Sequence, residues 1–222
     1  MKTSLRNVLA AAIVASANLL SAEARAQSMM YPGVAVGLDE EESRFLPGLY
    51  YFNKGCDYEK RGDTKAAIDA WEIAAGWAMK DAQLKLGLAY FQGKGVDADR
   101  PRGLAWLALA AERKDASYDA VLATAWDEAS ASEHDRANAL WRELRKTNGD
   151  ETALPRARNR FTTELDRMTG SHIGGQAHVW TRARGKVDLG SYKAELLELA
   201  ERNFGRSAGA GAGIGRAEPA TD

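Results

Sequence analysis

The sequence predicts an all-α protein: a short α-solenoid of two to three stacked antiparallel helix pairs, followed by C-terminal helices and a disordered tail. Residues 80–116 contain two apolar helical segments joined by a glycine-punctuated loop. The motif Lys-Asp-Ala occurs at residues 80–82 and again at 114–116, and tryptophans recur every 35 residues, at Trp71, Trp106 and Trp141. Repeated apolar helix pairs are typical of solenoids because one pair cannot cover its own apolar surface.

The chain begins with the pattern of a secretory signal peptide. Residues 1–26 combine a basic start, an apolar run too short to span a bilayer as an anchor, and the small-x-small sequence that ends at Ala26. We therefore expect cleavage after Ala26 and a periplasmic or secreted protein without a transmembrane anchor. Residues 27–46, which include an acidic cluster, are predicted to be a solvated lead-in to the first helix, with a docking peptide as the alternative.

The middle unit shows the plan of each helix pair most clearly. Its first helix is apolar on two opposite sides and therefore needs a neighbour on each side. Gly93 and Gly95 break the helical period, Asp99 can cap the second helix, and Pro101 falls in its first turn, where a missing N–H costs least. The second helix carries no charge from residue 104 to residue 111, so it too is expected to be buried.

The neighbouring units follow the same plan. Upstream, a glycine and a tyrosine lie 32 residues before their counterparts in the middle unit. Downstream, the second Lys-Asp-Ala motif starts a degenerate third unit, which ends in an amphipathic helix with a Ser130–Glu133 capping box and Gly149 as a stop. This helix is predicted to close the stack, and the repeats are predicted to fill residues 47–148.

The middle unit resembles the Sel1-like repeat (SLR) family, relatives of the tetratricopeptide repeat. The matching positions are small, aromatic and capping residues at fixed offsets: Ala82, Leu86, Gly87, Tyr90, Gly93, Gly95, Val96, Asp99, Trp106, Ala110 and Ala111. The resemblance covers roughly residues 47–146 and weakens in the first and third units. It implies stacked helix pairs and a protein-binding role in scaffolding, envelope regulation or virulence.

Residues 149–205 are predicted to form a helical extension. One helix, between Pro155 and Met168, carries an apolar stripe, and a second amphipathic helix is capped by Ser191 and ends at Gly205. The arginines of the first helix are interpreted as a solvated face; docking on the acidic repeats or on an anionic envelope surface is the alternative. Residues 206–222 are Gly/Ala-rich and are predicted to be disordered.

The segment between these helices, residues 169–185, is the one stretch whose composition suggests a site. His172 and His178 lack a carboxylate or cysteine at ligand spacing, so no metal site is predicted. The glycines neither follow a strand nor open a helix, which argues against a phosphate-binding loop. We expect a short hairpin or ordered loop that packs Val179 and Trp180 on the last repeat.

Composition narrows the function mainly by exclusion. The net charge of −1 gives no indication of a nucleic-acid partner. The single cysteine, Cys56, cannot form an intrachain disulfide and is interpreted as a buried, inert thiol, with a reactive or intermolecularly paired thiol as the alternative. The sequence contains no nucleophile elbow, zinc-protease motif, Cys-x-x-Cys pair or Walker loop. We therefore predict a protein that is not an enzyme and uses no cofactor or metal.

These observations favour an exported helical-repeat protein that binds another envelope protein or a peptide, as a scaffold or regulator. The alternative is an envelope enzyme or a protein that binds peptidoglycan or another glycan. In stacked helix pairs the first helix of each unit lines the inner surface, so its polar positions are the predicted partner site. They form a mixed-charge strip of six residues: Asn53, Lys60, Lys85, Gln92, Asp119 and Trp126. Trp126 is its candidate anchor, and the alternative is that Trp126 caps the core.

Overall fold

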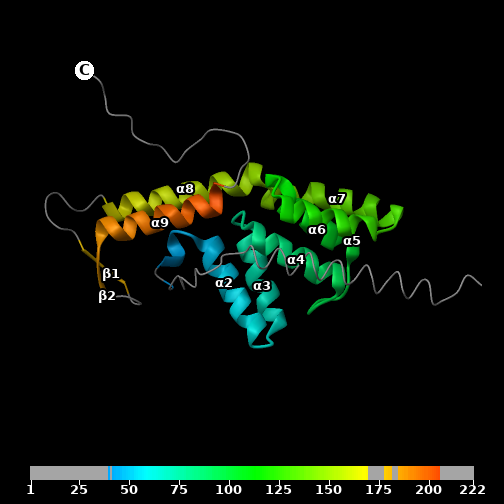
Figure 1. The fold of residues 1–222 in the computed structure, drawn as a ribbon, viewed down its shortest axis with the longest axis horizontal. Coiled ribbons are helices and arrows are strands. Elements are labelled where there is room, and N and C mark those ends of the chain that lie inside the picture. The colour runs from blue at the N-terminus through cyan, green and yellow to red at the C-terminus, as the bar shows by residue number, and fades with distance from the viewer. Residues whose placement is uncertain (1–39, 41, 170–177, 182–184, 206–222) are drawn as a thin grey trace, which may run out of the picture.

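The computed structural model describes residue 40 and residues 42–169, 178–181 and 185–205. The predicted signal peptide, most of the predicted lead-in and the predicted disordered tail lie outside the described residues. The described part of the chain is helical apart from one two-stranded hairpin (Figure 1). The predicted all-α class and the stack of helix pairs are confirmed.

The helices and strands follow one another in a simple order. The first two units are η1 (Glu42–Arg44), α2 (Pro47–Lys60), α3 (Thr64–Ala75), α4 (Lys80–Gln92), α5 (Arg100–Ala110) and η2 (Ala111–Arg113). The third unit and the C-terminal extension are α6 (Ala116–Asp127), α7 (Ala131–Asn148), α8 (Asp150–Thr169), β1 (His178–Thr181), β2 (Gly185–Asp188) and α9 (Leu189–Phe204).

Side-chain caps start the second helix of each unit, as the sequence predicts for Asp99 and Ser130. The carboxylate of Asp63 accepts a hydrogen bond from the backbone of Ala66 at the start of α3, and Asp99 does the same for Arg102 at the start of α5. At α7 the predicted capping box between Ser130 and Glu133 is present. Each cap satisfies a backbone N–H that the first helical turn leaves without an intrahelical partner.

Two glycines let α4 and α5 approach closely. A Cβ atom at Gly103 would lie 2.6 Å from the backbone nitrogen of Phe91 and 2.7 Å from the carbonyl oxygen of Gly87. A Cβ atom at Gly87 would lie 2.7 Å from Cγ of Leu107. Small residues are required at this crossing because any side chain would have to displace the opposite helix. The third unit is looser: α7 packs mainly against α5, and α6 buries only Val121 and Ala125.

The C-terminal helices return to the first unit. Phe161 of α8 and Leu196 and Phe204 of α9 belong to the same buried cluster as Phe45 and Trp71 near the N-terminal end of the described chain. In Figure 1, α8 and α9 run side by side along one edge of the molecule, above α2 and α3. The predicted apolar stripes of these helices therefore face the first repeat.

Three local predictions for this extension were wrong. Helix α8 begins at Asp150, so Pro155 lies inside it rather than at its start. The cap of α9 is Asp188, which accepts a hydrogen bond from the backbone of Ser191, because the helix begins at Leu189 directly after β2. The predicted hairpin is present, but Trp180 is 74% exposed and does not pack on a repeat.

Among the described helices, none is long and apolar enough to cross a membrane.

Candidate functional site

Single side-chain contacts link the first helices of neighbouring units, while the predicted partner site itself stays a prediction. Between α2 and α4, the ammonium group of Lys85 lies 3.0 Å from a carboxylate oxygen of Glu59. Between α4 and α6, the hydroxyl of Tyr118 donates a hydrogen bond to Asp81. We call the polar positions of α2, α4 and α6 the first-helix surface.

Lys85 is held inside this surface rather than offered to solvent. Its side chain is 12% exposed, and besides the ion pair with Glu59 its nitrogen lies 5.3 Å from the centre of the Trp71 ring. The half-buried thiol of Cys56 is close by: burial raises the pKa of Cys56 more than the positive charge of Lys85 lowers it. A raised thiol pKa keeps Cys56 protonated at neutral pH, which favours the inert interpretation.

Trp126 is also occupied by contacts within the chain. Its ring stacks on His134, with 4.0 Å between the ring centres and 1° between the planes, and its carbonyl oxygen lies 2.9 Å from Nε2 of His134. Its other contacts are with the apolar cluster that includes Leu84 and Phe91. Trp126 is half-buried, so the structure gives it the role of closing the turn between α6 and α7, and an anchor function for a partner stays a prediction.

The remaining members of the predicted strip are more accessible. Lys60 is exposed and pairs with Asp57 at 3.4 Å, while Asn53 and Asp119 are half-buried. Gln92 is half-buried as well, and its side-chain oxygen is buried with no hydrogen-bond partner among the described residues. A buried acceptor without a donor is costly, and because this oxygen is shielded from solvent it is not itself a contact point for a partner.

A cleft lies where the loop between α4 and α5 faces the first turn of α7. It is an open cleft of about 700 Å³, whose walls include Tyr90, Asp97, Arg102 and Arg136. The guanidinium of Arg102 lies over the Tyr90 ring at 4.4 Å. The sequence predicted the two helix starts that border this cleft, at Asp99 and Ser130. It did not predict the cleft, because a sequence pattern does not show how far apart two helix starts lie in space.

Sequence reasoning missed a network of buried charges behind the repeats. The nitrogen of Lys80 lies 2.8 Å from Glu112 and 3.0 Å from Asp150, and Arg113 binds Asp150 through two hydrogen bonds of 2.7 and 3.0 Å. Burial acts to raise the pKa of Asp150, but the hydrogen bonds and charges of Arg113 and Lys80 outweigh it and hold that pKa below 3.8. The network joins α4, η2 and the start of α8, so its role is to fix the extension on the repeats.

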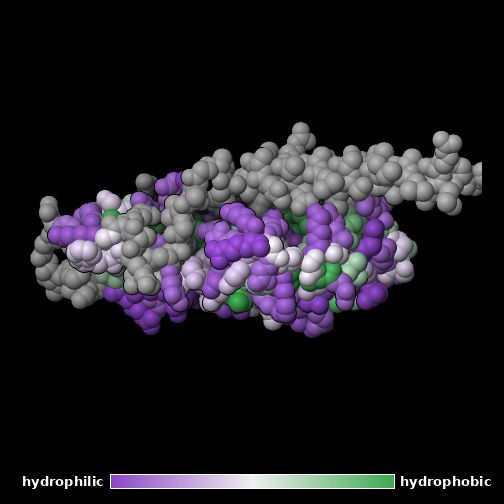
Figure 2. All heavy atoms as spheres, turned by 90° about the horizontal axis from the view of Figure 1, so that it is seen from below, coloured by the Kyte–Doolittle hydropathy of each residue, from purple (hydrophilic) through white to green (hydrophobic). Residues whose placement is uncertain are grey.

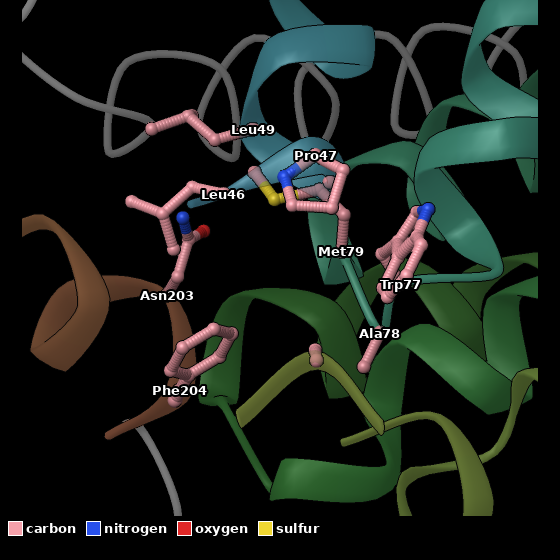
Figure 3. Close-up of a pocket in the computed structure, with 10 residues that line it drawn as sticks. Leu46, Pro47, Leu49, Trp77, Ala78, Met79, Asn203 and Phe204 are labelled. Atoms are coloured by element: carbon pink, nitrogen blue, oxygen red, sulfur yellow. The ribbon is translucent and has the colours of Figure 1, made fainter. Parts of the chain in front are cut away.

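The cavity at the junction of the repeats with α9 is too small for a small-molecule ligand. The cavity drawn in Figure 3 lies between Leu46, Trp77, Met79 and Phe204 and has a volume of only about 10 Å³. That is room for about one water molecule. Within the described residues, no group of three His, Cys, Asp or Glu side chains could hold a metal ion. The face seen in Figure 2 is mainly hydrophilic, with only scattered apolar atoms.

The fold defines a helical-repeat protein. Residues 80–115 match the Sel1 repeat, which covers the middle unit α4–α5, so the predicted resemblance is confirmed for this unit. Sel1 repeats generally mediate protein–protein interactions and are typically non-catalytic.

Comparison with individual proteins adds little to this assignment. No curated protein matches the chain. Among solved structures, one that is similar is a protective antigen present in uropathogenic Escherichia coli strains, which displays an SLR fold. The two share 15% sequence identity with a TM-score of 0.42, over 76% of this chain and 35% of the antigen. The chain thus spans about a third of the length of that protein.

Proposed function

We propose that the protein is an exported, non-catalytic scaffold or regulator that binds an envelope protein or peptide through its first-helix surface. The observation that carries this proposal is the match of residues 80–115 to the Sel1 repeat, a family that generally mediates protein–protein interactions. The polar positions of α4, together with those of α2 and α6, are the proposed contact surface.

The surface can be tested with a tagged full-length chain captured from an envelope fraction. Gln92→Leu and Asp119→Ala together should remove any specifically bound partner, because they delete polar groups of the surface without touching the core clusters. Lys65→Ala is the matched control, since Lys65 is an exposed residue of α3 that pairs with Asp69 on the same helix. Partners that survive the double substitution, in a protein whose thermal unfolding is unchanged, would show that another surface binds them.

Export is proposed from the signal-peptide pattern of residues 1–26. The mature chain should begin at Gln27 and appear in the periplasmic or secreted fraction. Mass spectrometry of the purified protein reads this directly: an N-terminal peptide that begins at Met1 in the fractionated cells would remove the export proposal while leaving the partner surface untouched.

A further inference from the structure

The outer face of the hairpin carries four exposed side chains, one of which is a large aromatic ring. Strands β1 and β2 pair antiparallel with His178 opposite Asp188 and Trp180 opposite Lys186. Because side chains alternate along a strand, these four point to the same side of the hairpin, and all four are exposed. We call them the outer hairpin face. In Figure 1 the hairpin lies at one end of the α8–α9 pair, at the opposite end of the molecule from α7.

This face rests on a fixed base. Val179 and Val187, on the other side of the hairpin, pack against the main core cluster, and Thr181 is buried. The carboxylate of Asp188 accepts hydrogen bonds from the backbone nitrogen and the hydroxyl of Ser191, at 2.9 and 3.1 Å, which ties β2 to α9. The outer hairpin face is therefore part of a packed element and not the end of a free loop.

The ring of Trp180 is positioned with much of its surface free. A ring carbon of Trp180 lies 3.9 Å from the position that a Cβ atom at Gly185 would occupy, which is ordinary van der Waals contact. Trp180 is nevertheless 74% exposed, the most exposed of the large apolar side chains in the described residues. One flat aromatic surface is thus presented beside an ammonium group and a carboxylate, those of Lys186 and Asp188.

We propose that the outer hairpin face binds a polysaccharide, with a pyranose ring stacked on Trp180. The C–H groups on one side of a pyranose form an apolar surface with slight positive charge, and they match the electron-rich face of an indole. The ring hydroxyls project around the edge of the sugar, where Lys186 can donate and Asp188 can accept hydrogen bonds. This proposal concerns a surface separate from the first-helix surface and goes beyond the proposed protein-binding function.

Size and charge favour a sugar over the other occupants of an exposed tryptophan. A second copy of the chain would need about 800 Å² of buried surface per partner, whereas one tryptophan supplies at most about 250 Å² and each strand has only four residues. An anionic lipid surface would meet the carboxylate of Asp188, which offsets the positive charge of Lys186 on the same face. One or two sugar rings fit a small face that carries both charges.

The experiment is a pelleting assay with the purified full-length protein and insoluble glycans. Purified peptidoglycan sacculi, chitin and cellulose are the probes, and they separate a general pyranose site from one that needs N-acetylated or wall-specific sugars. Wild-type protein should pellet with at least one of them. Trp180→Ala should weaken that binding by about tenfold or more, and Trp180→Phe should retain part of it. Ile73→Ala removes the other exposed large apolar side chain and should change nothing.

Three results would overturn the proposal. Wild-type protein could stay in the supernatant with all three glycans, or Trp180→Ala could pellet as well as wild type. Alternatively, Trp180→Ala could abolish self-association measured by light scattering, or binding to phosphatidylethanolamine–phosphatidylglycerol vesicles, without affecting glycan binding. Capture of a protein partner through the first-helix surface should be the same for wild type and Trp180→Ala, so failure of either proposal is recognised separately.

Discussion

Replacing Lys80 by Met tests whether the buried charge network holds the extension on the repeats. Lys80 is 5% exposed, and its nitrogen contacts the side chains of Glu112, Asp150 and Gln83 and the carbonyl oxygen of Leu109. Methionine preserves the apolar stem of the lysine and removes only the charge and its hydrogen bonds. The substitution therefore isolates the ion network from packing.

The expected cost follows from what the substitution leaves behind. Breaking a buried ion pair by removing one partner costs about 3–5 kcal/mol. The lower end applies here, because Asp150 keeps Arg113, and Glu112 keeps the backbone nitrogen of Asp150 at 2.9 Å. We expect the free energy of unfolding to fall by about 3 kcal/mol, which corresponds to a drop in Tm of roughly 6–12 °C for a chain of this size.

Urea unfolding followed by circular dichroism measures this difference, with Lys65→Met as the matched control. Lys65 also forms an ion pair, with Asp69 at 2.7 Å, but it lies on the solvent side of α3. Its replacement should leave the unfolding midpoint unchanged, since exposed pairs contribute little. The effect of Lys80→Met should persist at high salt because buried charges are screened weakly. A loss below about 1 kcal/mol, the range of surface pairs, would refute the reasoning.

Three further predictions follow from the same contacts. Asp150→Asn should lower the free energy of unfolding at neutral pH and make it depend less on pH in acid. Despite burial, Arg113 holds the pKa of Asp150 below 3.8 in the folded chain. The stabilisation by this carboxylate is therefore present above pH 3.8 and disappears as the pH falls further. Gly87→Leu should cost about 1–3 kcal/mol by overpacking in thermal unfolding, unlike Ala139→Leu on the exposed side of α7. A double-mutant cycle of Trp126→Ala and His134→Ala should give a coupling of about 0.5–1.5 kcal/mol, and additive effects would contradict the structural role of the stack.

The candidate site was only partly predictable. The sequence predicted polar positions on the first helices, and side-chain contacts link α2 to α4 and α4 to α6. It did not indicate that Glu59 and Trp71 enclose Lys85, or that Trp126 stacks on His134. A helical wheel gives the direction of a side chain from its own axis, whereas these contacts depend on how a neighbouring helix is placed.

By itself, the sequence determined the helices of the repeats, the side-chain caps of their second helices and the repeat itself. These depend on interactions within one or two turns: the carboxylates of Asp63 and Asp99 bond to backbone groups three residues away, and apolar periodicity marks the buried side of each helix. Only the tertiary structure decided that α8 and α9 fold back on the first unit, that Lys80 is buried among carboxylates, and that Trp180 remains exposed. Those outcomes depend on which apolar surfaces meet across long stretches of chain. A sequence pattern shows that one side of a helix is apolar, but it does not show which other apolar surface will cover it.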